Sequence, residues 1–236
     1  MKALPLFILG LLSSAYLQAN SLNLDTIDLD KARAYQAYVM TFEWPQSASS
    51  EDVEYQDIFS LEGLNRFAVN SGASAPSSVP NPFAKFQRTF ANRTKVLSNN
   101  SWTLIFPDTG ASISERFQSD AQENGYATFT GQVTFTLNRY LESNLRYQHY
   151  QFGQPAVAQS TEPPSQYPAS GSTEAPQATY ALQQSNWDGP TQVLSLRFRN
   201  KTASQKLNYV DHPIIGTLIY FEPLDLEQAI DLVSER

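Results

Sequence analysis

Cysteine is absent from this chain of 236 residues, so no disulfide can cross-link the fold and no lipid can be attached to a lipobox cysteine. The hydrophobic core must therefore supply the stability. Histidine is scarce as well, because His149 and His212 are too few for a zinc site unless carboxylates join them. The sequence has no HExxH, GxSxG or SxxK motif. We therefore expect no catalytic residue, no metal ion and no cofactor.

Positive charge is in deficit, with 16 Lys and Arg against 23 Asp and Glu and a formal net charge of −7. A protein that binds nucleic acid or an anionic lipid surface needs a positively charged surface of its own. We therefore expect no nucleic-acid partner and no capture by an anionic membrane surface, although local basic patches stay possible.

Long hydrophobic runs are also missing, except near the N-terminus, where Lys2 precedes the apolar residues 4–12 and small residues follow. This order is typical of a secretory signal peptide, and we expect cleavage after Ala19. The run is too short to cross a bilayer, which takes about 20 residues. The sequence thus predicts a signal peptide over 1–19 and a single exported domain over 20–236. We expect a periplasmic protein with no lipid anchor and no direct membrane insertion.

Two segments, 70–82 and 153–191, are rich in Pro, Ser and Ala, and the second is also rich in Gln. The second has few aliphatic residues, so it cannot bury enough apolar surface to offset the entropy lost on ordering. We predict that 153–191 is a long, disordered, exposed loop. It is expected to lie within one domain, because the segments on its two sides have the pattern of strands from the same sheet.

Local patterns predict strands over 34–44, 101–106, 131–141, 145–152, 192–200 and 214–221, with clear alternation of apolar and polar residues over 131–141. The first is apolar on both faces and should be central. Phenylalanines at helical spacing predict a helix within 83–97, and a capping-box spacing from Asp225 to Gln228 predicts a C-terminal helix. The expected fold class is α+β, a mainly antiparallel sheet with a few helices packed on it and the Pro/Ser/Ala-rich loop inserted.

The sequence Asp211-His212-Pro213 precedes the last predicted strand. Proline favours an extended conformation at His212, and consecutive side chains of an extended chain point to opposite sides. We therefore expect a structural corner, with the Asp211 carboxylate accepting backbone amides. A hydrolase using Asp211, His212 and another carboxylate is the catalytic alternative. Gly216, inside the following strand, indicates a close approach of another backbone.

A stripe of cations is predicted on one face of the strand 192–200, where Arg197, Arg199 and Lys201 alternate with apolar residues. Arg139 and Arg146 are expected on strands that are its neighbours. Such a stripe could hold the carboxylates of an anionic polymer through bidentate arginine contacts. The alternative is an ordinary solvated face whose charges protect a sheet edge from aggregation.

Two blocks of this sequence resemble the CsiV family of periplasmic peptidoglycan-binding proteins of Gram-negative bacteria. The family has a Gly-led strand that runs into Arg-Tyr-Leu, and an aromatic-Asp-His-Pro turn before a Gly-containing strand. The matching residues are Gly131, Leu137, Arg139, Tyr140 and Leu141 in the first block, and Asp211, His212, Pro213, Ile214, Ile215, Gly216 and Leu218 in the second. The segment 35–45 is similar to the opening strand of the family.

The resemblance implies a non-enzymatic factor that binds peptidoglycan and assists a class A penicillin-binding protein together with its outer-membrane lipoprotein activator, and so contributes to cell-wall synthesis and cell shape. Under this hypothesis Arg139, Arg197 and Arg199 would hold stem-peptide carboxylates. Tyr140 would pack on sugar or peptide, and the corner at Asp211 and His212 would shape a binding edge. The alternative is an assembly protein that docks a protein partner through the loop and the C-terminal helix without touching the wall.

Overall fold

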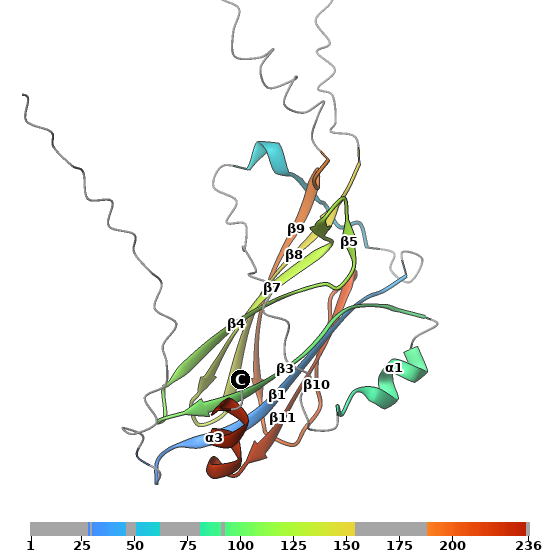
Figure 1. The fold of residues 1–236 in the computed structure, drawn as a ribbon. Coiled ribbons are helices and arrows are strands. Elements are labelled where there is room, and N and C mark those ends of the chain that lie inside the picture. The colour runs from blue at the N-terminus through green and yellow to red at the C-terminus, as the bar shows by residue number, and fades with distance from the viewer. Residues whose placement is uncertain are drawn as a thin grey trace, which may run out of the picture.

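A computed structural model describes residues 28, 30–45, 51–61, 81–90, 93–153 and 188–234. These residues form two antiparallel sheets that face each other, with helices on the far side of one sheet (Figure 1). The mainly antiparallel character that the sequence predicts is confirmed. The predicted signal peptide 1–19 and the segment 154–187 lie outside the described residues.

The first sheet, sheet A, has the strand order β10-β11-β1-β3. Its members are β10 (Asn208–Val210), β11 (Ile215–Leu224), β1 (Arg33–Glu43) and β3 (Lys95–Phe106). β1 lies between β11 and β3 and is buried along almost its whole length, as its two apolar faces predict.

The second sheet, sheet B, has the order β2-β9-β8-β7-β4. Its members are β2 (Gln56–Asp57), β9 (Gln192–Thr202), β8 (Leu141–Gln151), β7 (Phe129–Leu137) and β4 (Ser112–Gln118). A small hairpin, β5 (Gln122–Glu123) and β6 (Tyr126–Ala127), connects β4 to β7. Gln151 at the end of β8 lies opposite Gln192 at the start of β9. The two strands that flank the segment 153–191 are therefore direct neighbours in one sheet.

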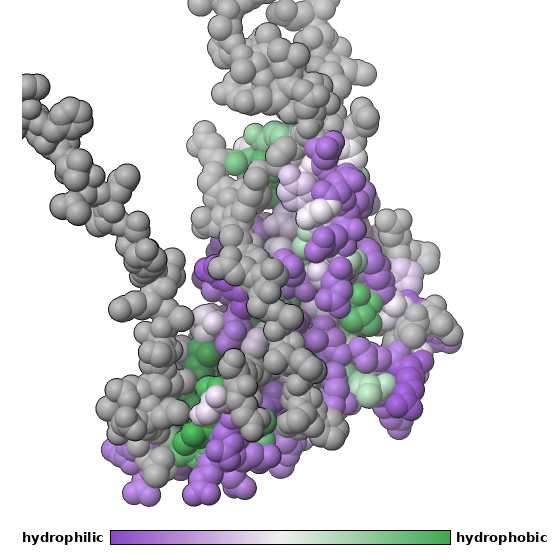
Figure 2. All heavy atoms as spheres, in the orientation of Figure 1, coloured by the Kyte–Doolittle hydropathy of each residue, from purple (hydrophilic) through white to green (hydrophobic). Residues whose placement is uncertain are grey.

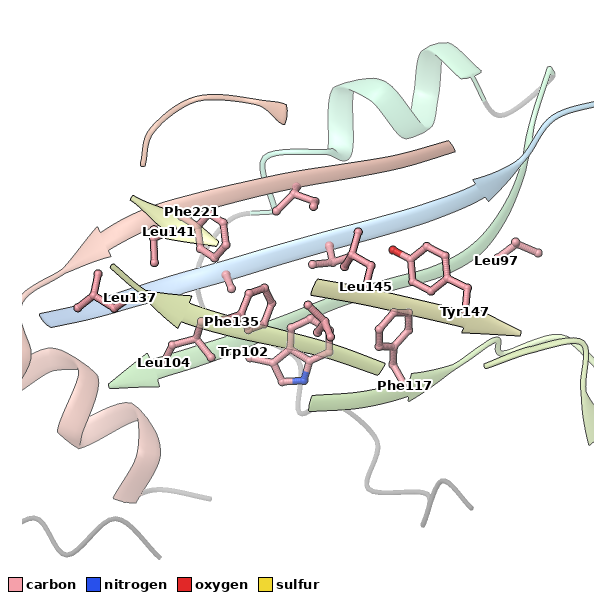
Figure 3. Close-up of a cluster of buried hydrophobic side chains, with 14 of the residues drawn as sticks. Leu97, Trp102, Leu104, Phe117, Phe135, Leu137, Leu141, Leu145, Tyr147 and Phe221 are labelled. Atoms are coloured by element: carbon pink, nitrogen blue, oxygen red, sulfur yellow. The ribbon is translucent and has the colours of Figure 1, made fainter. Parts of the chain in front are cut away.

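The main core fills the space between the sheets. Figure 3 shows side chains of both sheets pointing toward one another, with Trp102 of sheet A close to Phe117 and Phe135 of sheet B. One polar contact crosses this core, where the Thr217 hydroxyl donates to the Tyr147 oxygen over 3.2 Å. Full burial raises the pKa of Tyr147 far above its ordinary value.

The outer face of sheet A carries two helices, α1 (Ala84–Phe90) and α3 (Leu226–Ser234). Phe83 and Phe86 at α1 pack on alternate residues of β1, whereas α3 packs Ala229 and its apolar neighbours on Ala34 and Ile105. The apolar side of α3 is thus used within the fold. No helix in the described part of the chain is long and apolar enough to cross a membrane.

The visible surface of the described part is mostly hydrophilic (Figure 2). Two of its green patches lie at the places of α3 and of the short 3-10 helix η3 (Ile58–Ser60) in Figure 1.

Several predicted boundaries are wrong. The strands form two sheets, not one. The helix ends at Phe90, and β3 begins at Lys95, because Val96 and Leu97 pair with β1 around a bulge. The predicted strand 131–141 is split, since residues 138–140 form a turn and Leu141 begins β8. β4 was not predicted, although Ile113 and Phe117 alternate there with polar residues.

Candidate binding face

The outer face of sheet B is a polar surface on which residues from four strands align in rows. Arg116 of β4 lies opposite Gln132 of β7, which lies opposite Arg146 of β8, which lies opposite Arg197 of β9. All three arginines are exposed. We call Arg116, Gln132, Arg146 and Arg197 the arginine row. Strands in a sheet are about 4.8 Å apart, so the row extends roughly 14 Å across the sheet.

The arginine row makes no ion pair with any residue that the structure describes. Arg146 and Arg197 are direct cross-strand partners, and like charges in this position repel each other. An anion placed over the pair would relieve the repulsion and could accept hydrogen bonds from both guanidinium groups.

The neighbouring cations of β9 are already partnered. Arg199 donates to the Glu142 carboxylate at 2.7 Å, and the Lys201 ammonium lies 3.3 Å from the other oxygen of that carboxylate. The Arg199 guanidinium holds the pKa of Glu142 below its ordinary value. Of the predicted stripe, Arg197 is therefore the member that stays available to a ligand.

Short hydroxylated and amide side chains fill most of the rest of this face. Ser112 and Thr136 hydrogen-bond to each other at 2.7 Å, and Ser114 and Thr134 do the same in the next row. These groups can exchange hydrogen bonds with the hydroxyls and amides of a ligand. Five of the outward-facing residues of the four aligned strands are cations, namely Arg116, Arg146, Arg197, Arg199 and Lys201. Glu142 is the one carboxylate among the outward-facing residues of these strands.

Arg139 and Tyr140 lie away from the arginine row, in the turn that joins β7 to β8. The guanidinium carbon of Arg139 is 5.7 Å from the centre of the Tyr140 ring, so the two side chains stack on each other. Tyr140 is 51% exposed and is available at this end of the sheet. A ligand that touched both Tyr140 and the arginine row would have to run along β8.

Asp211 and His212 lie in the other sheet, in the connection between β10 and β11. No hydrogen bond joins their side chains; Asp211 accepts the Tyr209 hydroxyl at 2.5 Å, and His212 Nδ1 accepts the Ile214 amide at 3.2 Å. Among the described residues no backbone amide donates to Asp211, and its partner there is a side chain: Tyr209 and Asp211, two residues apart, lie on the same side of the extended chain. Residues 211–214 connect β10 to β11, which pair antiparallel.

The His212 ring packs edge-on against Phe198 at 6.0 Å, and burial lowers the pKa of His212 below its ordinary value. Because asparagine can offer its amide oxygen to Ile214 in the same way, we expect His212→Asn to change the melting temperature by only a few degrees. His212→Leu, which removes the acceptor, is expected to cost about 1–2 kcal/mol. Thermal unfolding of both variants tests the role. Equal losses would mean that packing on Phe198 dominates.

Sequence reasoning missed a second polar cluster. The Tyr55 hydroxyl and His149 Nδ1 are 2.7 Å apart, and His149 Nε2 lies 3.9 Å from Glu43, which also faces Lys95 at 3.6 Å. Burial raises the pKa of Tyr55 to about 12 and lowers that of His149. Tyr55 and His149 are 94 residues apart in sequence, and no local pattern signals their contact.

Tyr55, Glu43, Gln151 and Gln192 line a polar cavity of about 420 Å³. His149 lies behind Tyr55 and does not line this cavity. The His149 ring serves as a buried hydrogen-bond partner of Tyr55. Within the described residues, no group of three or more metal-ligating side chains could hold a metal ion.

No family model, no curated protein and no solved structure matches this chain.

Proposed function

We propose that this chain is a non-enzymatic binding factor of the periplasm that holds peptidoglycan on the outer face of sheet B. In this role it supports a class A penicillin-binding protein and the outer-membrane lipoprotein activator of that protein during cell-wall synthesis. The choice of peptidoglycan and of these partners rests on the sequence resemblance to the CsiV family. The choice of face rests on the arginine row.

The observation that carries the proposal is the directly opposed pair Arg146 and Arg197, extended by Arg116 across the sheet. Peptidoglycan presents carboxylates on its stem peptides and hydroxyls and amides on its sugars. A guanidinium group can donate two parallel hydrogen bonds to a carboxylate, and the surrounding serine and threonine hydroxyls can hydrogen-bond to the sugar hydroxyls and amides. The arrangement therefore suits a polymer that is both anionic and rich in hydrogen-bonding groups.

Binding by this face should be modest and sensitive to salt. The chain as a whole is acidic, with a net charge of −7, so long-range attraction to an anionic polymer is weak. The affinity must therefore come from the direct contacts of the arginine row. Exposed ion pairs contribute up to about 1 kcal/mol each and are screened at high ionic strength. Several such contacts along one polymer chain raise the apparent affinity by multivalency.

The test is co-sedimentation of the purified mature protein with purified sacculi at low salt. We expect the wild type to sediment and the double variant Arg146→Ala/Arg197→Ala to lose about tenfold in affinity, because two charge-assisted contacts are removed. Arg199 is left in place, because its removal would take away the ion-pair partner 2.7 Å from the Glu142 carboxylate. The matched control is Lys85→Ala/Arg88→Ala, which removes the same charge from α1 on the far side of sheet A.

A wild type that stays in the supernatant at low salt would overturn wall binding. Equal losses in both double variants would mean that net charge, not the arginine row, governs sedimentation, and would overturn the proposed face. The partner proposal is tested separately by affinity capture on the immobilised synthase and its activator.

A further inference from the structure

The cations on the outer face of sheet B lie along two lines that meet at Arg197. The first line is the arginine row, which crosses the sheet from Arg116 to Arg197. The second line runs along β9, where Arg197, Arg199 and Lys201 are alternate residues and share one face. Alternate residues of a strand are about 7 Å apart, so this line extends roughly 14 Å. We call its three residues the β9 line.

Glu142 holds two of the three cations of the β9 line. It lies directly opposite Lys201 in the pairing of β8 with β9. Its carboxylate is 2.7 Å from a guanidinium nitrogen of Arg199 and 3.3 Å from the ammonium nitrogen of Lys201. The Glu142 side chain is 9% exposed, whereas those of Arg199 and Lys201 are 66% and 63% exposed. The two cations therefore reach the solvent, and the carboxylate beside them competes with any anionic ligand for them.

The arginine row lies outside the reach of Glu142. Glu142 and Arg146 are four residues apart on β8, so their Cα atoms are about 14 Å apart. This separation exceeds the Debye length of about 8 Å at physiological ionic strength, and the charge of Glu142 is largely screened there. The carboxylate therefore occupies the β9 line beyond Arg197 and leaves the arginine row available.

The two lines suit anionic polymers of different charge density. Along a peptidoglycan strand, neighbouring stem peptides are separated by a sugar that carries no peptide, so their carboxylates can use the arginine row without the β9 line. A linear polyphosphate carries a negative charge on every phosphate and gains most where many cations are available together. On this face it would meet the carboxylate of Glu142 next to the β9 line. Specificity can arise from a group that disfavours the wrong ligand as well as from groups that favour the right one.

We propose that Glu142 restricts the outer face of sheet B to sparsely charged polymers and excludes densely charged polyanions such as polyphosphate. It does so by holding Arg199 and Lys201 in ion pairs and by placing a negative charge beside the β9 line. This inference rests on the proposed function for the identity of the polymer that the face accepts. The exclusion of polyphosphate is measured separately from wall binding.

The test is isothermal titration calorimetry of the purified mature protein with a short linear polyphosphate at low salt. We expect Glu142→Gln to bind polyphosphate at least about tenfold more tightly than the wild type, because two exposed cations become available and one negative charge is removed. In co-sedimentation with sacculi, the same variant should gain less than about threefold, because the arginine row is unchanged. Glutamine has nearly the shape of glutamate and can still accept a hydrogen bond from Arg199, so we expect the variant to fold. Thermal unfolding checks that it does.

Three control variants separate the role of Glu142 from a general effect of charge. Glu142→Asp keeps the carboxylate and should exclude polyphosphate as the wild type does. Asp231→Asn removes the same charge from an exposed position of α3, on the outer face of sheet A, and should not gain polyphosphate affinity. Adding Arg199→Ala and Lys201→Ala to Glu142→Gln should abolish the gain, because the released cations are then absent.

Unchanged polyphosphate affinity in Glu142→Gln would overturn the proposal, and so would an equal gain in Asp231→Asn or a gain that survives in the triple variant. Equal gains for sacculi and polyphosphate in Glu142→Gln would overturn the selectivity. A wild type that does not sediment with sacculi, together with the expected gain for polyphosphate, would instead overturn wall binding and support the exclusion of polyphosphate by Glu142.

Discussion

Gly131→Ala is expected to destabilise the fold by about 3 kcal/mol, near the upper end of what overpacking costs. A Cβ atom at residue 131 would lie 2.4 Å from the tip of the Phe117 ring, which lies over this glycine from the neighbouring strand. Phe117 has no room to retreat, because Trp102, Phe129 and Tyr147 surround it in the main core. Chemical denaturation of the variant and of the wild type measures the loss.

Gly216→Ala is the matched comparison, because the same kind of pair recurs there with Phe42. The sequence suggested close backbone approach at Gly216, but the neighbour is an aromatic ring. Phe42 lines a cavity of about 280 Å³ on the outer face of sheet A and can shift into it, so we expect a cost of only about 1 kcal/mol.

Phe117→Leu added to Gly131→Ala should recover part of the stability, because the smaller side chain makes room for the new methyl group. If Gly131→Ala and Gly216→Ala cost the same, the freedom of the ring to move is not what sets the penalty.

Unfolding at mildly acidic pH is expected to expose the role of His149. Burial, aided by Lys95 and opposed by Glu43, lowers the pKa of His149 below its value of 6.5 in an unfolded chain. As the pH falls through 6.5, the unfolded chain therefore binds a proton that the folded chain does not take up. The free energy of unfolding then falls with decreasing pH, by at most about 1.4 kcal/mol per pH unit for one proton.

We therefore expect the wild type to lose stability between pH 7 and pH 5.5, and His149→Gln to show a flatter profile over the same window. His212→Asn is the comparison, because the pKa of His212 is lowered in the same direction in a more exposed place. Arg199 holds the pKa of Glu142 low, so Glu142 stays ionised in this window. Its contribution to the free energy of unfolding is lost only at lower pH. Parallel slopes for the wild type and His149→Gln would rule out His149 as the source.

Local patterns were sufficient to predict most strands, because alternation reports which face of a strand is buried. Alternation predicts β7 and β9 and the exposure of Arg197, whereas two apolar faces predict β1. The partition into two sheets was not predictable, since it depends on which strands pair across long stretches of sequence. For the same reason the sequence does not predict the alignment of Arg116 with Arg146 and Arg197, since local patterns do not determine which residues of two strands lie opposite each other.

The contact of Tyr55 with His149 also comes from segments distant in sequence, and so does the cavity that Met40, Phe86 and Leu218 line. For Asp211 and His212, by contrast, the local argument was enough. Proline and the two-residue period of extended chain placed the two side chains apart, although they did not reveal that a tyrosine hydroxyl would be the partner of the aspartate.

The pairing of Gln151 with Gln192 has a consequence for how this chain can vary. Bringing the ends of a connecting segment together costs an entropy that grows only with the logarithm of its length. Each doubling of the number of residues between these two strands therefore adds only about 0.6 kcal/mol to that cost. The ladder of β8 and β9 therefore tolerates a change in the number of residues between these strands, provided that Gln151 and Gln192 stay paired.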